Sequence, residues 1–333
     1  MSGRSRTLVF VTQTIDPGHS FLAATVPKVA ALARRFDELV VLAFSARPGA
    51  LPPNCRVETF GAPSRLERGA RYLALLNREL ARRPAAVLAH MVPPFAVLAA
   101  PLARPRRVPV LLWFTHWKNS RTLELAERLS NVVLTVDPRS FPFPSPKVVP
   151  IGHGIDLELF PCTNREPHSP LRVVALGRTS PAKGYETIVR AARLAGVDLE
   201  IRGSSSTLEE RAERDRLIGL GARIEDPIPY GDVPALLFSK DVLVNNMREG
   251  ALDKVVYEAA ATCMPVLASN TGFEGLLPPE LRFARADHEE LAAKLRRLIE
   301  ADRGEIGRRL RAVVEERHSV DHWADEVARL VLR

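Results

Sequence analysis

Short apolar runs alternate with segments of helical period along the whole chain, and this alternation limits the possible folds more than any other feature. The first half contains TLVFVTQ, ELVVLAF, RVETF, AAVLAHM, PVLLWFT and NVVLTV, which are rich in branched residues and end at Pro, Gly or polar turns. Between them lie stretches of helical length, such as 21–36 and 64–83. Strands that alternate with helices form parallel sheets covered on both faces. The sequence therefore predicts an α/β protein with a doubly wound sheet.

A proline-rich segment at 137–170 interrupts this rhythm, and a second set of strands follows it. The strand candidates are 172–177, 198–203, 222–227, 241–246 and 265–269, and the helix candidates are about 183–195, 207–219, 232–239 and 252–263. A chain of 333 residues is also long enough for two domains of roughly 150 residues. We therefore expect two domains of similar architecture, at 1–150 and 151–310.

The tail from Asp287 onward has a charged, helical pattern. Its last part carries an apolar stripe of Val320, Trp323, Val327 and Val331, one helical turn apart. A stripe of this kind has to be covered. We expect a C-terminal helix at 311–333 that packs back on the first domain.

Neither the N-terminus nor the cysteines indicate export. The first residues lead into a strand without an apolar signal-peptide core, and no apolar run has the roughly 18 residues of a membrane helix. Cys55, Cys162 and Cys263 are far apart, without metal-ligand spacing and without clustered histidines. We expect three reduced thiols in a cytoplasmic protein with no metal site.

Positive charge is concentrated in the first half of the chain. Residues 1–150 contain 21 Lys and Arg against 9 Asp and Glu, whereas the remainder contains 26 against 30. Because 40 of the 47 basic residues are Arg, a GC-rich coding bias is one explanation. The other is an anionic partner for the first domain, such as a lipid surface or an acidic substrate. Nucleic-acid binding would rest on charge alone, since no recognised module is present.

The segment 64–83 carries much of this charge. On a helical projection one face is apolar, with Leu66, Ala70, Leu73, Leu76 and Leu80, and the other is basic, with Arg65, Arg68, Arg71, Arg78 and Arg82 beside Tyr72 and Leu75. Peripheral enzymes press such faces against anionic lipid. A solvated helix face explains the pattern equally well.

Two cations flank a loop that follows a strand in the second half. Gly177 ends the run RVVALG and Arg178 follows it, and Lys183 and Gly184 open the next helix. In open parallel sheets, ligands bind beyond the carboxyl ends of strands, where helix N-termini favour anions. A diphosphate would suit the guanidinium of Arg178, which can donate two parallel hydrogen bonds, and the compact ammonium charge of Lys183. The spacing is not that of a Walker loop.

A second cluster lies in NNMREGALDKVVYEAAATCMPVLAS. Glu249 and Asp253 stand near the start of a helix, where a carboxylate is favoured by the helix dipole and capping alone explains it. Glu258 lies within an otherwise apolar stretch, where a carboxylate is rarely left without a partner. It is therefore the stronger candidate for a functional group.

These motifs resemble the retaining glycosyltransferases of family 4. VPIGHGIDLELF resembles the family's junction segment, LGRTSPAKGYETIVRAA its donor segment, YGDVPALLFSKDVLVNN the approach to its donor loop, and EGALDKVVYEAAATCMPVLAS its Glu-Gly…Glu-Ala signature. The resemblance implies the GT-B fold, in which two Rossmann-like doubly wound domains face each other across a cleft. The first domain would bind the acceptor, and the second the nucleotide-sugar donor.

The resemblance also implies roles for single residues. Arg178 and Lys183 would bind the donor diphosphate and stabilise its developing charge, Glu258 would hold the ribose, and Glu249 would contact the sugar. The donor site would further include Gly18, from the loop DPGHS after the first strand, and Gly177, Gly250, Ala251, Asp253 and Lys254. His116 would act on the acceptor side as an assisting group, unless it is buried between Trp113 and Trp117 as a structural residue.

The sequence departs from the family pattern in three places. Eight residues separate Glu249 from Glu258, where the family has seven, so Asp253 and Lys254 would share the contact with the sugar. The first loop has one glycine, Gly18, where the family often has two, and His153 replaces the usual Asn of the junction. The acceptor domain is thus the less well matched half.

The expected activity is retaining transfer of a sugar, of the hexosyltransferase class. A nucleotide-diphosphate sugar would be the donor, and the acceptor would be the hydroxyl of a glycan, a lipid-linked molecule or a small molecule. The resemblance implies no metal, no cofactor and no protein nucleophile. A nucleotide-sugar epimerase and a non-catalytic nucleotide-binding protein remain as alternatives. The setting would be cytoplasmic, with a peripheral contact at the inner face of the membrane.

Overall fold

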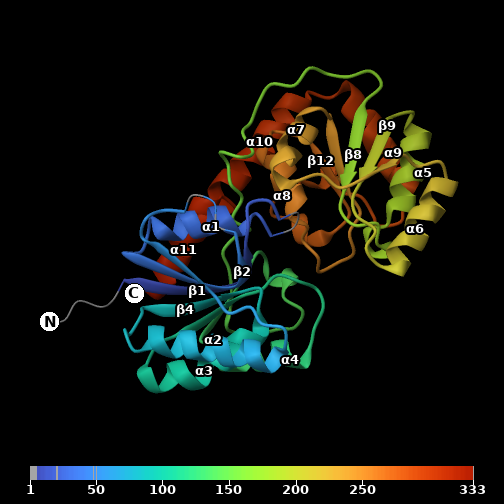
Figure 1. The fold of residues 1–333 in the computed structure, drawn as a ribbon. Helices are drawn as coiled ribbons and strands as arrows, with labels where there is room; N and C mark the ends of the chain where they lie inside the picture. Colours follow the sequence, from blue (N-terminus) through green and yellow to red (C-terminus); the bar gives the residue numbers. More distant parts are fainter. Residues whose placement is uncertain (1–5, 20–21, 48, 50, 333) are drawn as a thin grey trace. The chain divides into compact units, whose positions relative to one another are not determined.

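The computed structural model describes residues 6–19, 22–47, 49 and 51–332. The chain divides into two compact units: unit 1 is Met1–Gly154 together with Ser319–Arg333, and unit 2 is Ile155–His318. Each unit has one parallel sheet with helices on both faces (Figure 1). The predicted α/β, doubly wound fold class is confirmed. Ser20 of the expected loop DPGHS and Phe21 of the expected first helix lie outside the described residues.

Within the described residues, seven parallel strands form the sheet of unit 1, in the order β3-β2-β1-β4-β5-β6-β7. Their bounds are β1 (Thr7–Ile15), β2 (Glu38–Ala46), β3 (Cys55–Thr59), β4 (Ala86–His90), β5 (Val110–Trp113), β6 (Val132–Thr135) and β7 (Val148–Pro150). The chain runs outward from β1 to β3 and then crosses back to β4. The proline-rich segment supplies β7, a strand that its composition did not predict.

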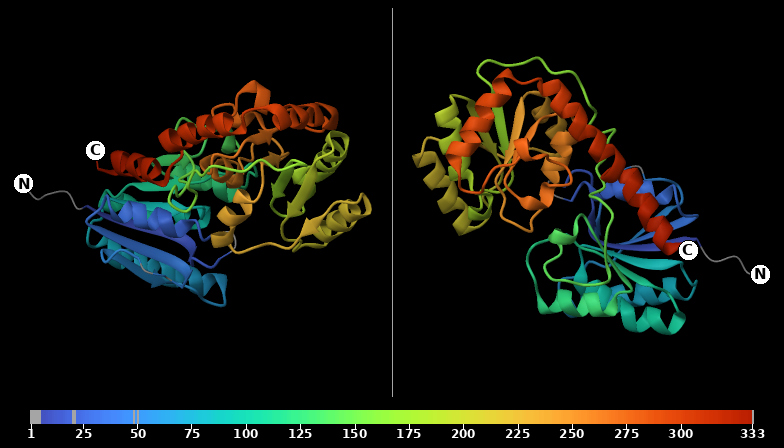
Figure 2. Two further views of the ribbon diagram at one scale, coloured as in Figure 1. Left: turned by 90° about the horizontal axis from the view of Figure 1, so that it is seen from above. Right: turned by 180° about the vertical axis from the view of Figure 1, so that it is seen from behind.

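Helices cover the two faces of this sheet (Figures 1 and 2). One face carries α2 (Arg65–Leu80), α3 (Pro93–Ala103) and α4 (Arg121–Leu129), and the other carries α1 (Thr25–Ala33) and α11 (Val320–Val331). Short turns lie at η1 (Arg104–Arg106) and η2 (Pro138–Ser140). Alternate residues of the central strands, such as Val9 and Val11 of β1, pack in the core beneath α2, α3 and α4.

The apolar stripe of α11 is buried within unit 1. Trp323 is fully buried and meets Trp113 edge to face, with ring centroids 5.6 Å apart. The Lys28 ammonium lies 5.1 Å from the Trp113 ring and 5.4 Å from the Trp323 ring. His90 adjoins this cluster, and burial together with the charge of Lys28 holds its pKa well below the usual value. Arg35 anchors the exposed side of α11 through Asp321 and Asp325.

The buried face of α2 is rotated from the face that the projection predicted. Tyr72, expected on the basic face, is fully buried and donates a hydrogen bond to the Phe95 carbonyl at 3.0 Å. Leu66, expected on the apolar face, is 89% exposed, and Ala70 is also exposed. These three placements are wrong because the aromatic ring of Tyr72 fits between Phe60 and Phe95, and this contact sets the rotation of the helix.

Several arginines on and near α2 are paired with carboxylates, although the side chain of Arg78 stays 49% exposed. Glu79 is buried and accepts from Arg56 at 2.6 Å and from Arg78 at 2.9 Å. Burial alone would raise the pKa of Glu79, but the hydrogen bonds from the two guanidinium groups outweigh it, so the pKa is lowered. Arg68 stacks on the Phe44 ring at 4.2 Å. The basic face is therefore partly an internal ion network.

Within the described residues, five parallel strands form the sheet of unit 2, in the order β10-β9-β8-β11-β12. Their bounds are β8 (Arg172–Leu176), β9 (Asp198–Arg202), β10 (Ile224–Glu225), β11 (Val242–Asn245) and β12 (Val266–Ala268). One face carries α5 (Tyr185–Ala195), α6 (Leu208–Gly219) and α9 (His288–Glu300), and the other carries α7 (Val233–Phe238), α8 (Lys254–Ala261) and α10 (Arg303–Arg317). Single turns lie at η3 (Pro181–Lys183), η4 (Tyr230–Asp232), η5 (Thr271–Phe273) and η6 (Pro279–Leu281).

The expectation of three reduced thiols is wrong for two of them. Cys162 and Cys263 form a disulfide across a sequence separation of 101 residues, because the fold brings the segment before β8 against the end of α8. Cys55 remains a free thiol, and burial raises its pKa to about 11. Sequence distance could not reveal this pairing. Among the described residues, no helix is long and apolar enough to cross a membrane.

The Glu79 network generates a stability prediction. Arg56→Met keeps a long side chain but removes two charge-assisted hydrogen bonds to a buried carboxylate, so the free energy of unfolding should fall by roughly 1.5–3 kcal/mol in urea titrations at pH 7. Because the folded-state pKa of Glu79 is depressed, this stabilisation is present above its unfolded-state pKa and is lost as the pH falls through the folded-state value.

The matched control is Arg82→Met, whose guanidinium is 60% exposed and lies 3.9 Å from Glu38. It should change the free energy of unfolding by less than about 0.5 kcal/mol. Equal effects of the two substitutions would contradict a special role for the buried Glu79.

Candidate functional site

The strand order of unit 2 creates one position where neighbouring loops diverge. From β8 the chain moves outward through β9 and β10, and it then crosses back to β11 on the other side of β8. All pairings in this sheet are parallel, so the carboxyl ends of β8 and β11 lie at the same edge. Ligands of open α/β sheets bind at such a topological switch point. The loops 177–184 and 246–253 therefore form the candidate site.

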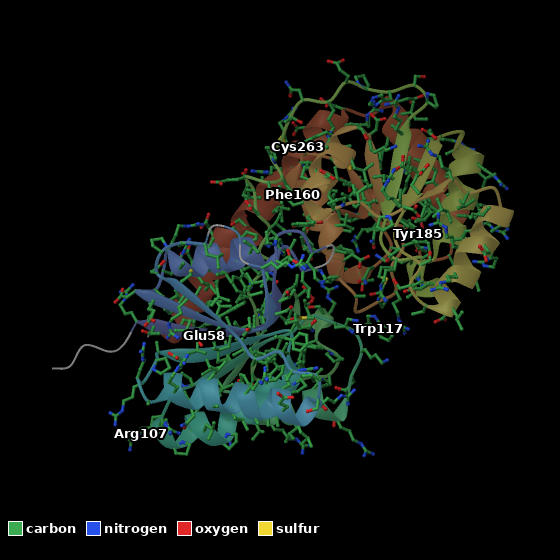
Figure 3. The ribbon with its side chains drawn as sticks, viewed as in Figure 1. Glu58, Arg107, Trp117, Phe160, Tyr185 and Cys263 are labelled. Atoms are coloured by element: carbon green, nitrogen blue, oxygen red, sulfur yellow. A yellow bond between two sulfur atoms is a disulfide. The ribbon has the colours of Figure 1, made fainter. Side chains whose placement is uncertain are left out.

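Glycine at position 177 permits a close approach after β8. Gly177 has φ 132°, and a Cβ there would lie 2.5 Å from Lys183 Nζ. Tyr185, buried at the start of α5, donates from its hydroxyl to the Gly177 carbonyl at 2.9 Å (Figure 3). The loop thus folds back over the strand end and fixes the direction of the lysine side chain.

Lys183 and Asp253 join the two loops. Lys183 Nζ lies 2.6 Å from Asp253 Oδ2 and 3.3 Å from the Leu176 carbonyl oxygen, with only 12% of the side chain exposed. Asn245, the last residue of β11, donates from Nδ2 to the same Asp253 oxygen at 2.7 Å. A cation from the first loop and a carboxylate from the second are thereby held at the switch point.

Backbone contacts lock the two loops together independently of this ion pair. The Arg248 N–H donates to the Ala182 carbonyl at 3.1 Å, and Asn246 Nδ2 donates to the Gly184 carbonyl at 2.9 Å. Gly184 has φ 56°, and a Cβ at this position would collide with Asn246. Arg285 also donates to the Ala182 carbonyl, at 3.1 Å. The backbone position of Lys183 is therefore fixed by hydrogen bonds to both of its neighbours, Ala182 and Gly184.

Glu258 has partners, as its apolar surroundings predicted. It is buried on α8, and its Oε1 accepts from the Tyr230 hydroxyl at 2.7 Å and pairs with Lys254 Nζ at 2.8 Å. The Lys254 ammonium lies 3.8 Å from the centre of the Tyr230 ring. Burial, followed by the charge of Glu258, raises the pKa of Tyr230, so this hydroxyl remains a donor. Phe160 also packs on Tyr230, with ring centroids 5.9 Å apart.

Arg178 points to a different partner from Lys183. Its guanidinium lies 3.1 Å from Glu210 Oε1 and is 57% exposed. Glu210 also accepts from the backbone N–H groups of Ser206 and Thr207 in the capping box of α6. Burial alone would raise the pKa of Glu210, but these hydrogen bonds and the charge of Arg178 lower it. Arg178 thus lies between the ends of β8 and β9.

Glu249 is exposed and bonds to the first residue of the turn η5. Its carboxylate accepts from the Thr271 N–H at 3.0 Å and from the Thr271 hydroxyl at 2.8 Å. The adjacent Gly250 has φ 77°, and the Ala251 carbonyl accepts from Asn270 Nδ2 at 3.0 Å. The structure therefore places Glu249, Gly250 and Ala251 on the β11 loop, next to the loop that follows β12.

The two predicted residues of unit 1 lie at the carboxyl ends of its strands. Gly18 follows β1, and its N–H donates to Asp16 Oδ1 at 2.9 Å. His116 follows β5, is exposed, and stacks on Trp117 with ring centroids 5.4 Å apart. Its Nδ1 accepts from the Lys118 N–H at 3.0 Å. The alternative of a buried structural histidine is therefore wrong, and Trp113 is the buried member of this motif.

Within unit 2, the structure brings together most of the predicted residues but adds three that sequence reasoning missed. Tyr230 and Asn245 hold Glu258 and Asp253, and Glu210 holds Arg178. The pair of asparagines that ends the apolar run DVLVNN was a usable signal, because polar amides at a strand end are available to a site. Nothing near Tyr230 in the sequence marked it as a partner of Glu258.

The arrangement is suited to a ligand with both anionic and hydroxyl groups. Two cations on the loop 177–184 and the N-terminal turn of α5 favour an anion at the end of β8. A buried carboxylate on α8 can accept hydrogen bonds from hydroxyl groups. Among the described residues, no group of three or more His, Cys, Asp or Glu side chains could hold a metal ion.

Comparisons with known proteins agree with this arrangement. Residues 178–329 match the family model described as glycosyl transferase-like. The match begins at Arg178 and includes Lys183, the β11 loop and Glu258. A search of curated proteins by sequence finds no match.

Solved structures resemble the chain over nearly its full length. HepE of Anabaena, solved in complex with UDP and glucose, has a TM-score of 0.73 at 18% identity over 98% of this chain and 99% of that chain. Sucrose-phosphate synthase of Thermosynechococcus elongatus has a TM-score of 0.72 at 18% identity over 98% of each chain. A putative UDP-N-acetylglucosamine 2-epimerase of Listeria monocytogenes reaches 0.60 at 14% identity over 97% of this chain and 95% of that chain.

The predicted resemblance thus holds for residues 178–329, which match a glycosyl transferase-like family model, and the chain has the GT-B fold.

The two tyrosines beside the site provide a matched stability test. Tyr230→Phe removes a hydrogen bond to the buried carboxylate of Glu258 and should lower the free energy of unfolding by roughly 1.5–3 kcal/mol. Tyr185→Phe removes a bond to a neutral carbonyl and should cost about 1 kcal/mol. Urea unfolding of both variants measures the difference. A Tyr230→Phe cost no larger than that of Tyr185→Phe would contradict the role of Tyr230 in holding the Glu258 side chain.

Proposed function

We propose that this protein is a retaining glycosyltransferase that moves a hexose from a nucleotide-diphosphate sugar to an acceptor hydroxyl. The observation that carries the proposal is the position of Lys183, held 2.6 Å from Asp253 at the switch point between β8 and β11. The family match over 178–329 supports it, as does the similarity to a structure solved with UDP and glucose.

Lys183 and Arg178 would bind the diphosphate and stabilise its charge as the sugar leaves. Among the described residues, Lys183 Nζ has two acceptors, the Leu176 carbonyl and Asp253, so the ammonium retains one N–H for a phosphate oxygen. Its position is set before the ligand arrives, which means that little reorganisation is needed during the reaction. Removing one such preorganised donor typically lowers the rate by about 100-fold to 1,000-fold.

Glu258 would hold the ribose hydroxyls of the nucleotide. Tyr230 and Lys254 both engage Oε1, so they fix the orientation of the carboxylate that the hydroxyls would meet. Asp253 and Lys254 would share the sugar contact with Glu249, because Glu249 is engaged with Thr271 on the outer side of the β11 loop. Gly177, Gly250 and Ala251 would contribute backbone groups, and Gly18 a loop of unit 1.

The acceptor would be a glycan, a lipid-linked molecule or a small molecule with a free hydroxyl. His116 is exposed and stacked on Trp117, which together offer an aromatic surface and a ring nitrogen after β5. The leaving phosphate would take the acceptor proton, and His116 would assist by orienting the hydroxyl. Bringing the reactants together supplies much of the remaining acceleration.

A nucleotide-sugar epimerase is the second candidate, because the similarity to the putative epimerase also spans nearly the whole chain. The two activities differ in their requirements: an epimerase converts the donor alone, whereas a transferase needs an acceptor. A non-catalytic protein would bind a nucleoside diphosphate without turnover.

Nucleotide binding is the first test of the transferase proposal. A panel of nucleoside diphosphates and nucleotide sugars, including UDP and UDP-glucose, should contain a ligand that raises the melting temperature of the wild-type protein. Lys183→Ala and Arg178→Ala should lose most of this shift because each removes a cation from the diphosphate site. Arg190→Ala is the control, since Arg190 lies on the outer side of α5 and pairs with Glu186.

No shift with any ligand in the wild type would contradict the proposal, as would a full shift in Lys183→Ala.

We also propose a cytoplasmic protein that makes a peripheral contact with anionic membrane at its inner face. The support is a set of exposed arginines before the amino-terminal ends of the neighbouring strands β4 and β5: Arg82, Arg83, Arg106 and Arg107. Arg106 bonds to Asn77, which joins η1 to the end of α2. Figure 3 shows Arg107 at the end of the unit 1 sheet opposite Trp117. This surface would leave the acceptor-side loops accessible.

Sedimentation with vesicles tests this contact. The protein should pellet with anionic phosphatidylglycerol vesicles at physiological salt and stay in the supernatant with neutral phosphatidylcholine, because each arginine near the surface contributes about 1 kcal/mol. Arg106→Ala combined with Arg107→Ala should reduce the bound fraction several-fold, whereas Arg211→Ala in unit 2 should not. Wild-type protein that remains in the supernatant with anionic vesicles would exclude the contact.

A further inference from the structure

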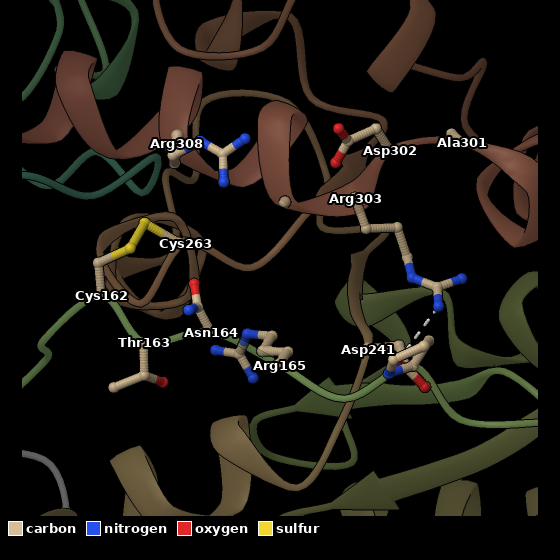
Figure 4. A pocket seen from close by; sticks show the side chains of 12 residues that line it. Cys162, Thr163, Asn164, Arg165, Asp241, Cys263, Ala301, Asp302, Arg303 and Arg308 are labelled. Atoms are coloured by element: carbon tan, nitrogen blue, oxygen red, sulfur yellow. Dashed lines mark ion pairs between the residues drawn. A yellow bond between two sulfur atoms is a disulfide. The ribbon is translucent and has the colours of Figure 1, made fainter.

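The disulfide Cys162–Cys263 borders a cavity that the donor site does not use. The cavity has a volume of about 350 Å³, and all of its lining residues belong to unit 2. It lies between the segment Cys162–Pro167, the start of β11, the end of α8 and the first turn of α10. Figure 4 shows the disulfide and Arg308 on one side of the cavity and the pair Arg303–Asp241 on the other.

The two sulfur-bearing residues differ in their access to solvent. Cys162 is exposed in a segment without helix or strand, whereas Cys263 is 5% exposed at the end of α8. A Cβ at Gly307 would collide with the Cys263 carbonyl, so α10 packs directly on this residue. A thiolate that arrives from solvent or from the cavity therefore meets Cys162 first.

Two arginines hold the cysteine segments together without help from the disulfide. Arg311 NH1 donates to the Phe160 carbonyl at 2.7 Å and to the Ala261 carbonyl at 2.6 Å, each two residues before a cysteine. Arg165, three residues after Cys162, donates to the Thr262 carbonyl at 3.0 Å and to its hydroxyl at 2.7 Å. The residues before and after Cys162 are thus hydrogen-bonded, through these arginines, to the segment that carries Cys263.

This anchoring gives a reduced pair of thiols little freedom to separate. Two groups held in proximity react as if at high effective concentration, so the disulfide can form again after it is broken. Disulfides in reducing compartments are typically transient or redox-sensing and not permanent staples. The cytoplasmic setting proposed above therefore requires a reversible bond, and this premise rests on the proposed function.

We propose that Cys162–Cys263 is a reversible thiol–disulfide exchange site, reduced through its cavity by a small thiol that carries carboxylates. The thiolate of the small molecule attacks Cys162 Sγ, the S–S bond breaks, and Cys263 leaves as a thiolate. A second small thiolate then attacks the sulfur of the first small molecule in the mixed disulfide. This step releases the Cys162 thiolate and a small-molecule disulfide. Two electrons pass from the two small thiols to the protein disulfide.

The preference for an acidic thiol follows from the charges that line the cavity. The cations are Arg165, Arg303 and Arg308, and the carboxylates are Asp241 and Asp302. Both carboxylates are already engaged: Asp241 accepts from the Arg172 N–H at 2.8 Å, and Asp302 accepts from the Glu305 N–H at 2.9 Å as the cap of α10. The first turn of α10 adds backbone N–H groups. The lining thus has one more cation than carboxylates, although Arg308 also pairs with Glu305 at 3.2 Å. A ligand with carboxylates is favoured by this surplus of positive charge.

The test uses the oxidised full-length protein and reduced glutathione as the acidic probe, with cysteamine as the cationic comparison. Samples are quenched with a denaturing alkylating buffer, and mass spectrometry counts the blocked thiols. Reduced glutathione should raise the number of blocked thiols from one, that of Cys55, to three. Oxidised glutathione should lower it to one again. The rate of disulfide reduction, divided by the concentration of the ionised small thiol, should be several-fold higher for glutathione than for cysteamine. The reduced protein should still melt cooperatively, because the arginine contacts remain.

Variants separate the steps. Cys263→Ser should accumulate glutathione on Cys162, whereas Cys162→Ser should accumulate far less on the buried Cys263. Arg308→Ala, at a side chain that is 58% exposed, should slow glutathione several-fold and leave cysteamine unchanged. The proposal is overturned if the native disulfide resists glutathione that reduces the denatured chain, if reduction unfolds the protein, or if cysteamine reacts as fast. None of these readouts involves a nucleotide, so they stand apart from a failure of the transferase proposal.

Discussion

The crossover from β10 back to β11 is the constraint on which the rest of unit 2 depends. Parallel strands must be joined by crossovers, and a sheet that grows first to one side of β8 and then to the other leaves a gap between the loops that follow β8 and β11. Lys183 comes from one of these loops and Asp253 from the other. The ion pair and the backbone bonds around Ala182 exist because the topology places these two chain segments side by side.

The two halves of the candidate site are stabilised in different ways. Lys183 is positioned by a loop that needs glycine at 177 and 184, so its placement is a backbone property. Glu258 is positioned by side chains, through the hydroxyl of Tyr230 and the ammonium of Lys254. A buried carboxylate without such donors would be costly. The first half supplies positive charge and the second supplies hydrogen-bond acceptors, which is the division that a nucleotide diphosphate requires.

Sequence patterns located the strands and the two loops of the candidate site well, because both depend on local features. Apolar runs bounded by turn residues located the strands, and Gly177-Arg178 and Lys183-Gly184 marked a loop whose spacing is local. What depends on distant packing was missed: the pairing of Cys162 with Cys263, the burial of Tyr72, and the contact between Tyr230 and Glu258. The periodicity of α2 was correct, but Phe60 and Phe95 set its rotation, and neither belongs to that helix.

A crystal structure of the protein soaked with UDP tests the central claim most directly, because it observes the diphosphate itself. The account predicts phosphate oxygens within hydrogen-bond distance of Lys183 Nζ and the ribose hydroxyls on the Glu258 carboxylate. Ordered UDP elsewhere, with the contacts of Lys183 to Asp253 and Leu176 unchanged and no ligand at the ends of β8 and β11, would contradict it.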